Sequence, residues 1–150
     1  MKSIMDKSTR DELAIRISKL NDNSKPLWGK MNVFQMVRHC SLWEEWVLSG
    51  KTYKQSFVGR IFGSMVLKNI MKDESPLKKN TPTLPEFRVN RLGEKGDLTA
   101  EKLKWIGLIE KYPNFSNPNF VHSFFGKMTK EQIGYLAYKH TDHHLRQFNC

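Results

Sequence analysis

Residues 130–148 read KEQIGYLAYKHTDHHLRQF, and this stretch carries the clearest pattern in the chain. At its start, Thr129 and Gln132 have the spacing of a capping box, which marks the beginning of a helix. Apolar residues then recur at the 3.6-residue spacing of an α-helix; they are Ile133, Leu136 and Ala137. The stretch therefore predicts a helix that buries one face and runs almost to the end of the sequence.

Two histidines continue this apolar stripe. At about 100° per residue, His140 and His144 fall on the inner side, one turn apart. Asp142 is expected to point outward, and His143 to lie at the edge of the stripe. Two imidazoles at positions i and i+4 can converge on one metal ion. The alternative is that they are ordinary polar residues at a half-exposed helix end, although burying two unpaired rings is costly.

Helical spacing also dominates the rest of the chain. Further helices are predicted at residues 9–20, 32–50, 57–72 and 99–112. Residues that favour helix N-caps stand at the start of three of them, namely Thr9, Asn32 and Thr99. Gly50 is expected to end the second helix, and three prolines exclude a regular helix from the crossover at residues 73–97. The fold class predicted is all-α, a bundle of about four principal helices with extra short pieces.

The composition is that of an ordinary globular domain, and residues 1–150 are expected to form a single unit. The chain is 39% hydrophobic and 27% charged, with a formal net charge of +10. Residues 51–104 carry 12 basic side chains against 6 acidic ones. No block of like charges and no zinc-finger spacing accompanies this excess, so it predicts a Lys-rich surface and no nucleic-acid partner. Nucleic-acid binding is an alternative that rests on charge alone.

The chain is expected to be cytoplasmic. Its N-terminal residues lack the apolar run of a signal peptide, and no window approaches the ~18 apolar residues of a membrane span. Cys40 and Cys150 are a poor basis for a disulfide framework. Residues 57–72, FVGRIFGSMVLKNIMK, are apolar and basic enough to lie on a membrane surface, but a core helix whose lysines reach the solvent is the favoured interpretation.

Two further histidines and one cysteine are candidates for chemistry. His39 flanks the apolar stripe of the second helix, beside Trp43 and Trp46, and by itself is weak evidence for a metal ligand. Cys40 lies nearer the centre of that stripe and is most simply a small buried hydrophobe, with a metal thiolate or a nucleophile as alternatives. His122 stands in an irregular segment, where a side chain bonded to the backbone is the simplest interpretation.

Three segments carry a resemblance to a known family. They are WGKMNVFQMVRHC at 28–40, FFGKMT at 124–129 and HTDHHLRQF at 140–148. In order and separation they resemble a branch of the DinB/YfiT-like superfamily of metalloenzymes that is catalogued only as a domain of unknown function. The resemblance spans residues 28–148, and its most specific element is the H-x-x-H-H-x-x-Q run near the end.

This resemblance implies an up-down-down-up four-helix bundle with one long crossover. It also implies a nickel or zinc ion held by one histidine of the second helix and two of the last, which are His39, His140 and His144. Three neutral imidazoles leave coordination positions open, as in catalytic metal sites. Similar superfamily members include thiol-dependent S-transferases, so thiol transfer and metal-assisted hydrolysis are the two reaction types implied.

We therefore expect a metal-dependent enzyme that acts on a small molecule. Gln147 is the candidate for orienting a ligand or water, and His143 and His122 are candidates for a proton shuttle. A basic crossover above the site would favour an anionic substrate; its charges include Lys78, Lys79 and Arg88. The alternative is a non-catalytic bundle that binds a metal or small ligand, or that dimerises through an apolar helix face.

Overall fold

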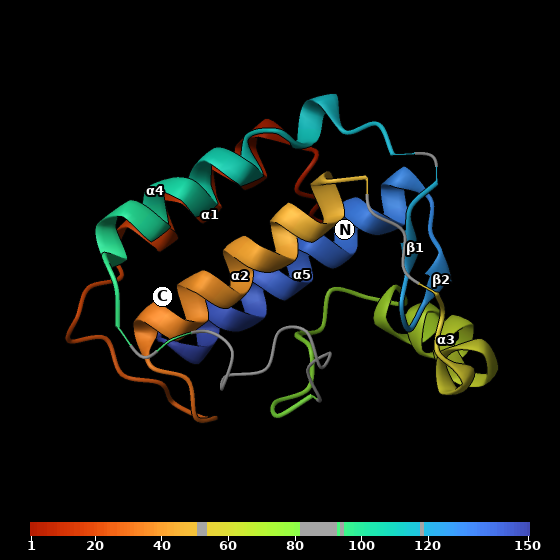
Figure 1. Ribbon diagram of the computed structural model, residues 1–150, viewed down its shortest axis with the longest axis horizontal. Coiled ribbons are helices and arrows are strands. Elements are labelled where there is room, and N and C mark those ends of the chain that lie inside the picture. Colours follow the sequence, from red (N-terminus) through yellow and green to blue (C-terminus); the bar gives the residue numbers. More distant parts are fainter. Residues whose placement is uncertain (51–53, 82–92, 94, 118) are drawn as a thin grey trace.

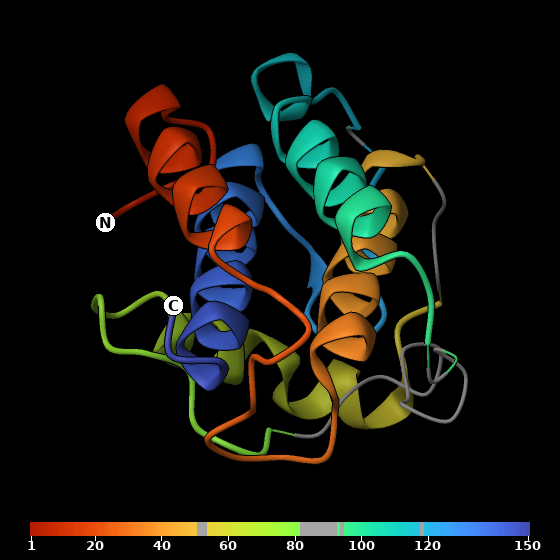
Figure 2. The ribbon, with the colours of Figure 1, turned by 90° about the vertical axis from the view of Figure 1, so that its left-hand side faces the viewer.

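Four helices form a bundle in the computed structural model of the protein. They are α1 (Lys7–Ser18), α2 (Val33–Leu48), α4 (Leu98–Ile109) and α5 (Lys130–Gln147). α1 and α2 each pack against both α4 and α5, and α1 and α5 run opposite to α2 and α4 (Figures 1 and 2). The all-α class and the up-down-down-up order are therefore confirmed. The structure describes residues 1–50, 54–81, 93, 95–117 and 119–150.

The remaining elements lie outside this bundle. They are α3 (Phe57–Ile70), η3 (Tyr112–Asn114), β1 (Val121–His122) and β2 (Gly126–Lys127). β1 and β2 form a short antiparallel hairpin, and α3 packs against it at one end of the molecule (Figure 1). The sequence does not predict this hairpin, because two-residue strands are too short to show alternation. No described helix is long and apolar enough to cross a membrane.

Two of the predicted helix starts are confirmed. The side chains of Asn32 and Thr129 accept the backbone N–H of Gln35 and Gln132, whose side chains bond back to complete capping boxes. The predicted end of the second helix is confirmed as well, since Gly50 has a φ of +72° just after α2. Local sequence signals therefore decide where α2 and α5 lie along the chain.

Two other predicted starts are wrong by a few residues. α1 begins after Asp6 rather than after Thr9, because Ile4 is fully buried and already fixes the chain just before the helix. α4 begins after Asp97 rather than after Thr99, because the Asp97 carboxylate accepts a backbone N–H of the first turn. Asp97 thus takes the N-cap position in place of Thr99 through its side chain, whereas the Asp6 side chain makes no cap hydrogen bond.

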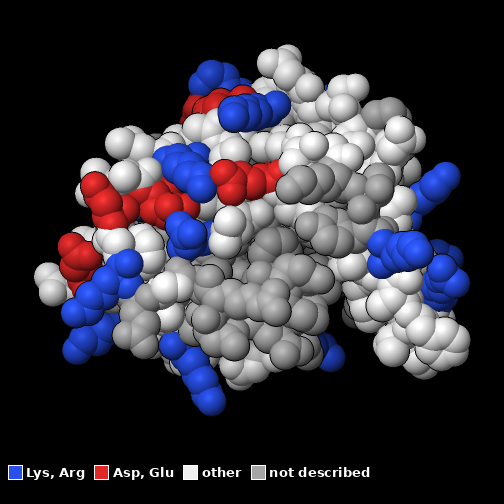
Figure 3. Space-filling model, viewed as in Figure 1, with Lys and Arg blue, Asp and Glu red and all other residues white. Residues whose placement is uncertain are grey.

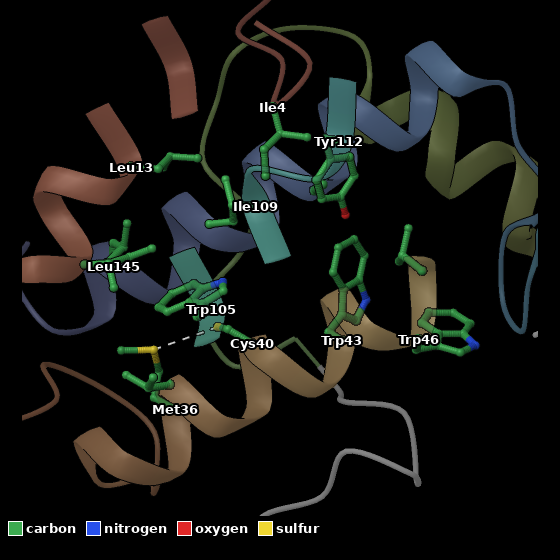
Figure 4. Packing of buried hydrophobic residues seen from close by; sticks show 14 of the residues in the cluster. Ile4, Leu13, Met36, Cys40, Trp43, Trp46, Trp105, Ile109, Tyr112 and Leu145 are labelled. Carbon is green, nitrogen blue, oxygen red and sulfur yellow. Dashed lines mark hydrogen bonds between the residues drawn. The ribbon is translucent and has the colours of Figure 1, made fainter. Parts of the chain in front are cut away.

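The core lies between the four bundle helices, and Figure 4 shows part of it. Met36, Cys40 and Trp43 of α2 pack in one cluster with Trp105 and Ile109 of α4. The Cys40 sulfur lies 3.9 Å from the Met36 sulfur, and burial raises the pKa of the Cys40 thiol well above its usual value. Cys40 therefore behaves as a small buried hydrophobe in this fold.

The outward orientation predicted for Asp142 is wrong. Its side chain is buried, and it accepts hydrogen bonds from Arg16 of α1 at 2.8 Å and from Arg146 at 2.6 Å. α5 packs against α2 on one side and against α1 on another, so a position that faces away from α2 meets a second helix instead of water. The Arg16–Asp142 ion pair joins α5 to α1.

The core-helix interpretation of residues 57–72 is also wrong. α3 buries Gly59, Gly63 and Leu67, while its large apolar residues face outward. The two glycines let the helix lie directly on the hairpin: a Cβ at Gly59 or Gly63 would come within 2.4 or 2.2 Å of the Phe124 carbonyl oxygen. Close backbone packing, rather than burial of large side chains, attaches α3 to the rest of the fold.

We predict that Gly63→Ala loosens α3. The added methyl group would clash with the Phe124 carbonyl, and overpacking of this kind costs ~1–3 kcal/mol. Hydrogen exchange should then show the α3 amides losing protection. Gly107→Ala on the exposed side of α4 is the control, because nothing lies within 4 Å of the added Cβ, and it should gain ~0.5–1 kcal/mol. Unchanged protection of α3 in Gly63→Ala would contradict the close-packing argument.

Candidate metal centre

The structure brings His39, His140 and His144 together between α2 and α5. The Nε2 atoms of His39 and His140 lie 3.1 Å apart, and the three side chains each offer one nitrogen within 4.8 Å of the others. His39 and His144 are only 3% and 7% exposed. This three-histidine cluster contains His140 and His144, which the helical periodicity of α5 predicts to face inward. It also contains His39 of α2, which the family resemblance implies as a ligand.

Burial keeps the two α5 histidines neutral. It lowers the pKa of His140 and of His144 well below the usual 6.5, and the neighbouring imidazoles lower both values further. A neutral imidazole has a free lone pair, which is the form that a metal ion binds. Around pH 7 both rings are therefore in the protonation state that coordinates a metal.

The donor set fits a divalent ion. Two nitrogens 3.1 Å apart can both lie at the ~2.0–2.1 Å typical of zinc–imidazole bonds from one ion. Without an ion, only one of the two Nε2 atoms can carry the hydrogen that they share. The ring of His140 is positioned by Trp43, which stacks on it at a centroid distance of 4.6 Å. Its Nδ1 is buried and has no hydrogen-bond partner among the described residues.

Gln147 fixes the orientation of His144. The Nδ1 of His144 lies 3.0 Å from the Gln147 Oε1, and the Gln147 Nε2 donates to the Trp28 carbonyl at 2.7 Å. Because an amide oxygen can only accept, His144 carries its hydrogen on Nδ1 and keeps Nε2 for a metal. Gly29, with a φ of +82°, leaves the space, since a Cβ there would lie 2.6 Å from the Gln147 Nε2. These two contacts form a hydrogen-bond relay from His144 through Gln147 to the Trp28 carbonyl. The predicted orienting role of Gln147 rests on this relay.

His143 lies beside the three-histidine cluster and is not part of it. Its ring packs against the His144 ring at 5.2 Å and edge-on to Trp28 at 5.6 Å. Burial lowers the pKa of His143, and a hydrogen bond to the backbone of Leu77 opposes this shift. The Lys79 ammonium lies 4.7 Å from the centre of the Trp28 ring. The crossover therefore approaches the site at the C-terminal half of α5.

Lys139, which precedes His140 in the sequence, anchors the start of the crossover. Its ammonium donates to the carbonyls of Ile70, Asp73 and Ser75 at 2.6, 2.6 and 3.1 Å, and the residue is 6% exposed. These three acceptors satisfy the buried charge without a carboxylate and cap the end of α3. The sequence reasoning missed this residue, because backbone acceptors leave no signal in the sequence.

His122 stands on the hairpin and also lies outside the cluster. Its Nδ1 accepts the backbone N–H groups of Phe124 and Phe125, both at 3.1 Å, which confirms a histidine bonded to the backbone. The hydrogen is therefore on Nε2, which has no hydrogen-bond partner among the described residues. Burial lowers the pKa of His122 from 6.5 to about 4. The ring packs against Trp46, and it is close enough to His140 to contribute to the lowered pKa there.

One family model matches the chain. It is described as a protein of unknown function (DUF1569), and the match covers residues 4–150. The chain belongs to the DUF1569 family. No curated protein and no solved structure matches this DUF1569 chain. The family description names no activity, and the place of this chain in the DinB/YfiT-like superfamily stays a prediction.

We predict that Gln147→Leu weakens zinc binding by this DUF1569 protein. The change removes the acceptor for the Nδ1 hydrogen of His144, and losing such a partner lowers metal affinity by ~10–100-fold. Competition with a chromophoric chelator measures the affinity. Gln132→Leu is the control, because it removes a capping hydrogen bond at the opposite end of α5 and should leave the affinity unchanged. Equal zinc affinity in Gln147→Leu and wild type would contradict the relay.

We also predict that His122 makes the stability of this DUF1569 protein depend on pH. Between pH 6.5 and about 4 the unfolded chain binds a proton at this residue and the folded protein does not, so the free energy of unfolding falls as the pH falls. His122→Asn retains a side-chain acceptor and cannot titrate. Denaturation of metal-free protein at pH 7 and pH 4.5 should show a loss that is ~2 kcal/mol smaller in this variant. The same loss in both proteins would contradict a neutral, buried His122.

Proposed function

We propose that this protein is a metal-dependent enzyme acting on a small molecule, with His39, His140 and His144 as its metal ligands. The observation that carries this proposal is the convergence of three imidazoles, those of His39 and His144 buried and that of His140 partly buried, with the Nε2 atoms of His39 and His140 3.1 Å apart. Helix packing does not require three histidines in one place, and the buried Nδ1 of His140 has no hydrogen-bond partner among the described residues, which is costly. Nickel or zinc is the expected ion, because imidazole nitrogen suits both.

A divalent ion held by three neutral ligands keeps its full charge, and it would lower the pKa of a bound water or thiol and polarise a carbonyl group. The protein holds the ligands ready for this ion. Gln147 keeps the ring of His144 in one tautomer, and stacking on Trp43 fixes the ring of His140. Rings that are already oriented need little reorganisation when an ion or a substrate arrives.

Two histidines beside the cluster are suited to different tasks. His122 keeps its hydrogen on Nε2, because its Nδ1 accepts two backbone N–H groups; we assign it to donating a hydrogen bond rather than to moving protons. His143 is half-buried and neutral at pH 7, since burial lowers its pKa, and a neutral imidazole can accept a proton. His143 is therefore the proposed general base.

The proposed substrate is an anionic small molecule. Lys79 lies over Trp28, whose ring borders His143, so the crossover brings a positive charge to this end of the site. Lys78 of the same segment is exposed, and Arg88 lies outside the described residues. Thiol transfer and metal-assisted hydrolysis, the two reaction types that the resemblance implies, both admit such a substrate.

A second candidate function is a non-catalytic metal-binding bundle. The burial of His39 and His144 favours it, because structural metal sites are closed and catalytic ones keep an open position. In this case the ion would stabilise the packing of α2 against α5. Removing it would lower the free energy of unfolding and abolish no reaction.

We predict about one nickel or zinc ion per chain in untagged protein from cells supplied with both metals. His140→Ala and His144→Ala should each reduce this content at least tenfold, because each leaves two ligands in place of three. His143→Ala is the matched control: it removes a neighbouring imidazole of the same helix that lies outside the cluster, and it should retain the ion. Elemental analysis gives the metal content, and circular dichroism confirms that each variant folds.

Two results of this experiment would contradict the proposed site. One is sub-stoichiometric metal in the wild type together with no uptake on titration, and the other is equal loss of metal in His143→Ala. Thiol-consumption and ester-hydrolysis assays then separate the two candidate functions. An enzyme should lose activity on chelation and regain it with nickel or zinc, whereas inactivity of the metal-loaded wild type in every assay would favour the non-catalytic bundle.

A further inference from the structure

α3 presents an apolar stripe to the outside of the molecule. Its members and their exposed fractions are Phe57 (77%), Val58 (55%), Ile61 (53%), Phe62 (47%) and Met65 (60%). On a helical wheel these five side chains fall within about 140°, and the residues that face the hairpin lie on the opposite side. Singly scattered apolar residues are normal on a protein surface, whereas a contiguous stripe of large ones indicates an interaction site.

The hairpin holds α3 in this orientation. The N–H of Ser56 donates to the Ser123 carbonyl at 2.8 Å, and the Gln55 Nε2 donates to the Phe124 carbonyl at 3.0 Å. Gly59 and Gly63, one helical turn apart, both lie against the carbonyl group of Phe124. Because the helix cannot roll without breaking these contacts, its apolar stripe stays outward when the protein is free in water.

The charged side chains of this segment are all positive. Between residues 54 and 72 they are Lys54, Arg60, Lys68 and Lys72, and each is exposed. The first acidic residue that follows is Asp73, beyond the end of α3. On the face drawn in Figure 3, Lys and Arg without Asp or Glu stand at the end of the molecule where Figure 1 places α3, while Asp and Glu gather toward the other end among further Lys and Arg.

We infer that α3 is a docking surface for an anionic lipid membrane. The helix is ~21 Å long and stands at one end of the molecule (Figure 1), so it can lie flat along a lipid surface. Its apolar stripe would enter the headgroup region while its basic side chains attract anionic lipids, as interfacial amphipathic helices do. This inference is independent of the metal site.

Charge complementarity favours an anionic membrane over a second copy of the chain as the partner of α3. A symmetric dimer through α3 would bring the basic side chains of this segment in both copies close together, with no acidic residue of the helix to pair with them. An anionic membrane surface supplies the opposite charge over the whole length of the helix. The excess of positive charge in the middle of the sequence thereby has a physical role.

Co-sedimentation of the full-length protein with lipid vesicles tests the inference. We expect binding to vesicles of phosphatidylcholine containing phosphatidylglycerol at low salt, weaker binding as salt is added, and little binding to phosphatidylcholine alone. Phe57→Ser/Phe62→Ser and Lys68→Glu/Lys72→Glu should each weaken binding at least tenfold. The substituted side chains are exposed, so these variants are expected to fold.

Matched controls place equivalent changes elsewhere on the surface. Leu103→Ser alters an apolar side chain on α4 that is 66% exposed, and Lys25→Glu/Lys111→Glu makes the same change in net charge away from α3. Both should bind anionic vesicles nearly as the wild type does. All variants should keep the metal content of the wild type, which separates a failure here from a failure of the metal site.

Three results would overturn the inference. The first is no binding of the wild type to anionic vesicles at low salt. The second is equal loss of binding in the control variants and in those of α3. The third is a wild type that light scattering shows to be a dimer without lipid and that Phe57→Ser/Phe62→Ser converts to a monomer, because α3 would then be an interface between copies of the chain.

Discussion

The Nε2 atoms of His39 and His140 lie 3.1 Å apart inside the protein, a distance at which two neutral imidazoles can share only one hydrogen. The buried Nδ1 of His140 has no hydrogen-bond partner among the described residues, which costs ~1–3 kcal/mol, so the histidines do not by themselves stabilise this arrangement. Other contacts have to fix α2 against α5. The stacking of Trp43 on His140 joins the two helices, and the relay from the Trp28 carbonyl through Gln147 ties the end of α5 to the loop before α2. These contacts hold the rings in place. A metal ion bound by the three imidazoles would offset the free-energy cost of burying them.

A second buried polar group lies between the same two helices. Glu44 of α2 is fully buried, accepts a hydrogen bond from the Tyr112 hydroxyl, and lies 3.4 Å from the Thr141 hydroxyl of α5. Burial raises the pKa of Glu44 to about 8, so the carboxyl group is protonated at pH 7. An ionised carboxylate at this depth would favour protonated imidazoles, because opposite charges stabilise each other strongly in a low dielectric. A neutral Glu44 adds no charge of its own between α2 and α5.

The sequence predicts the part of this site that depends on local structure. The inward face of His140 and His144 follows from helical periodicity, and the capping boxes set where α2 and α5 begin, because both depend on residues a few positions apart. The third ligand is different, since His39 meets the α5 pair only through tertiary packing, and the resemblance rather than the periodicity identified it. The prediction that Asp142 faces the solvent is wrong because it also depends on tertiary packing. Asp142 does lie on the predicted side of the helix, but α1 covers that side. The role of Lys139 cannot be predicted from the pattern of side chains, because its three hydrogen-bond acceptors are backbone carbonyls.

The turn at residues 122–126 shows how an unpredicted element connects two surfaces of the molecule. The N–H of Phe124 donates to His122 and thereby sets the tautomer of that ring, while the carbonyl of Phe124 accepts from Gln55 and lies against the glycines of α3. One residue of the backbone therefore positions both the hydrogen-bond donor near the histidines and the helix at the end of the molecule. Periodicity alone could not show which side of α3 faces the protein, because its largest apolar residues form the outer stripe. The small residues decide it, since only a helix face without side chains can approach the turn this closely.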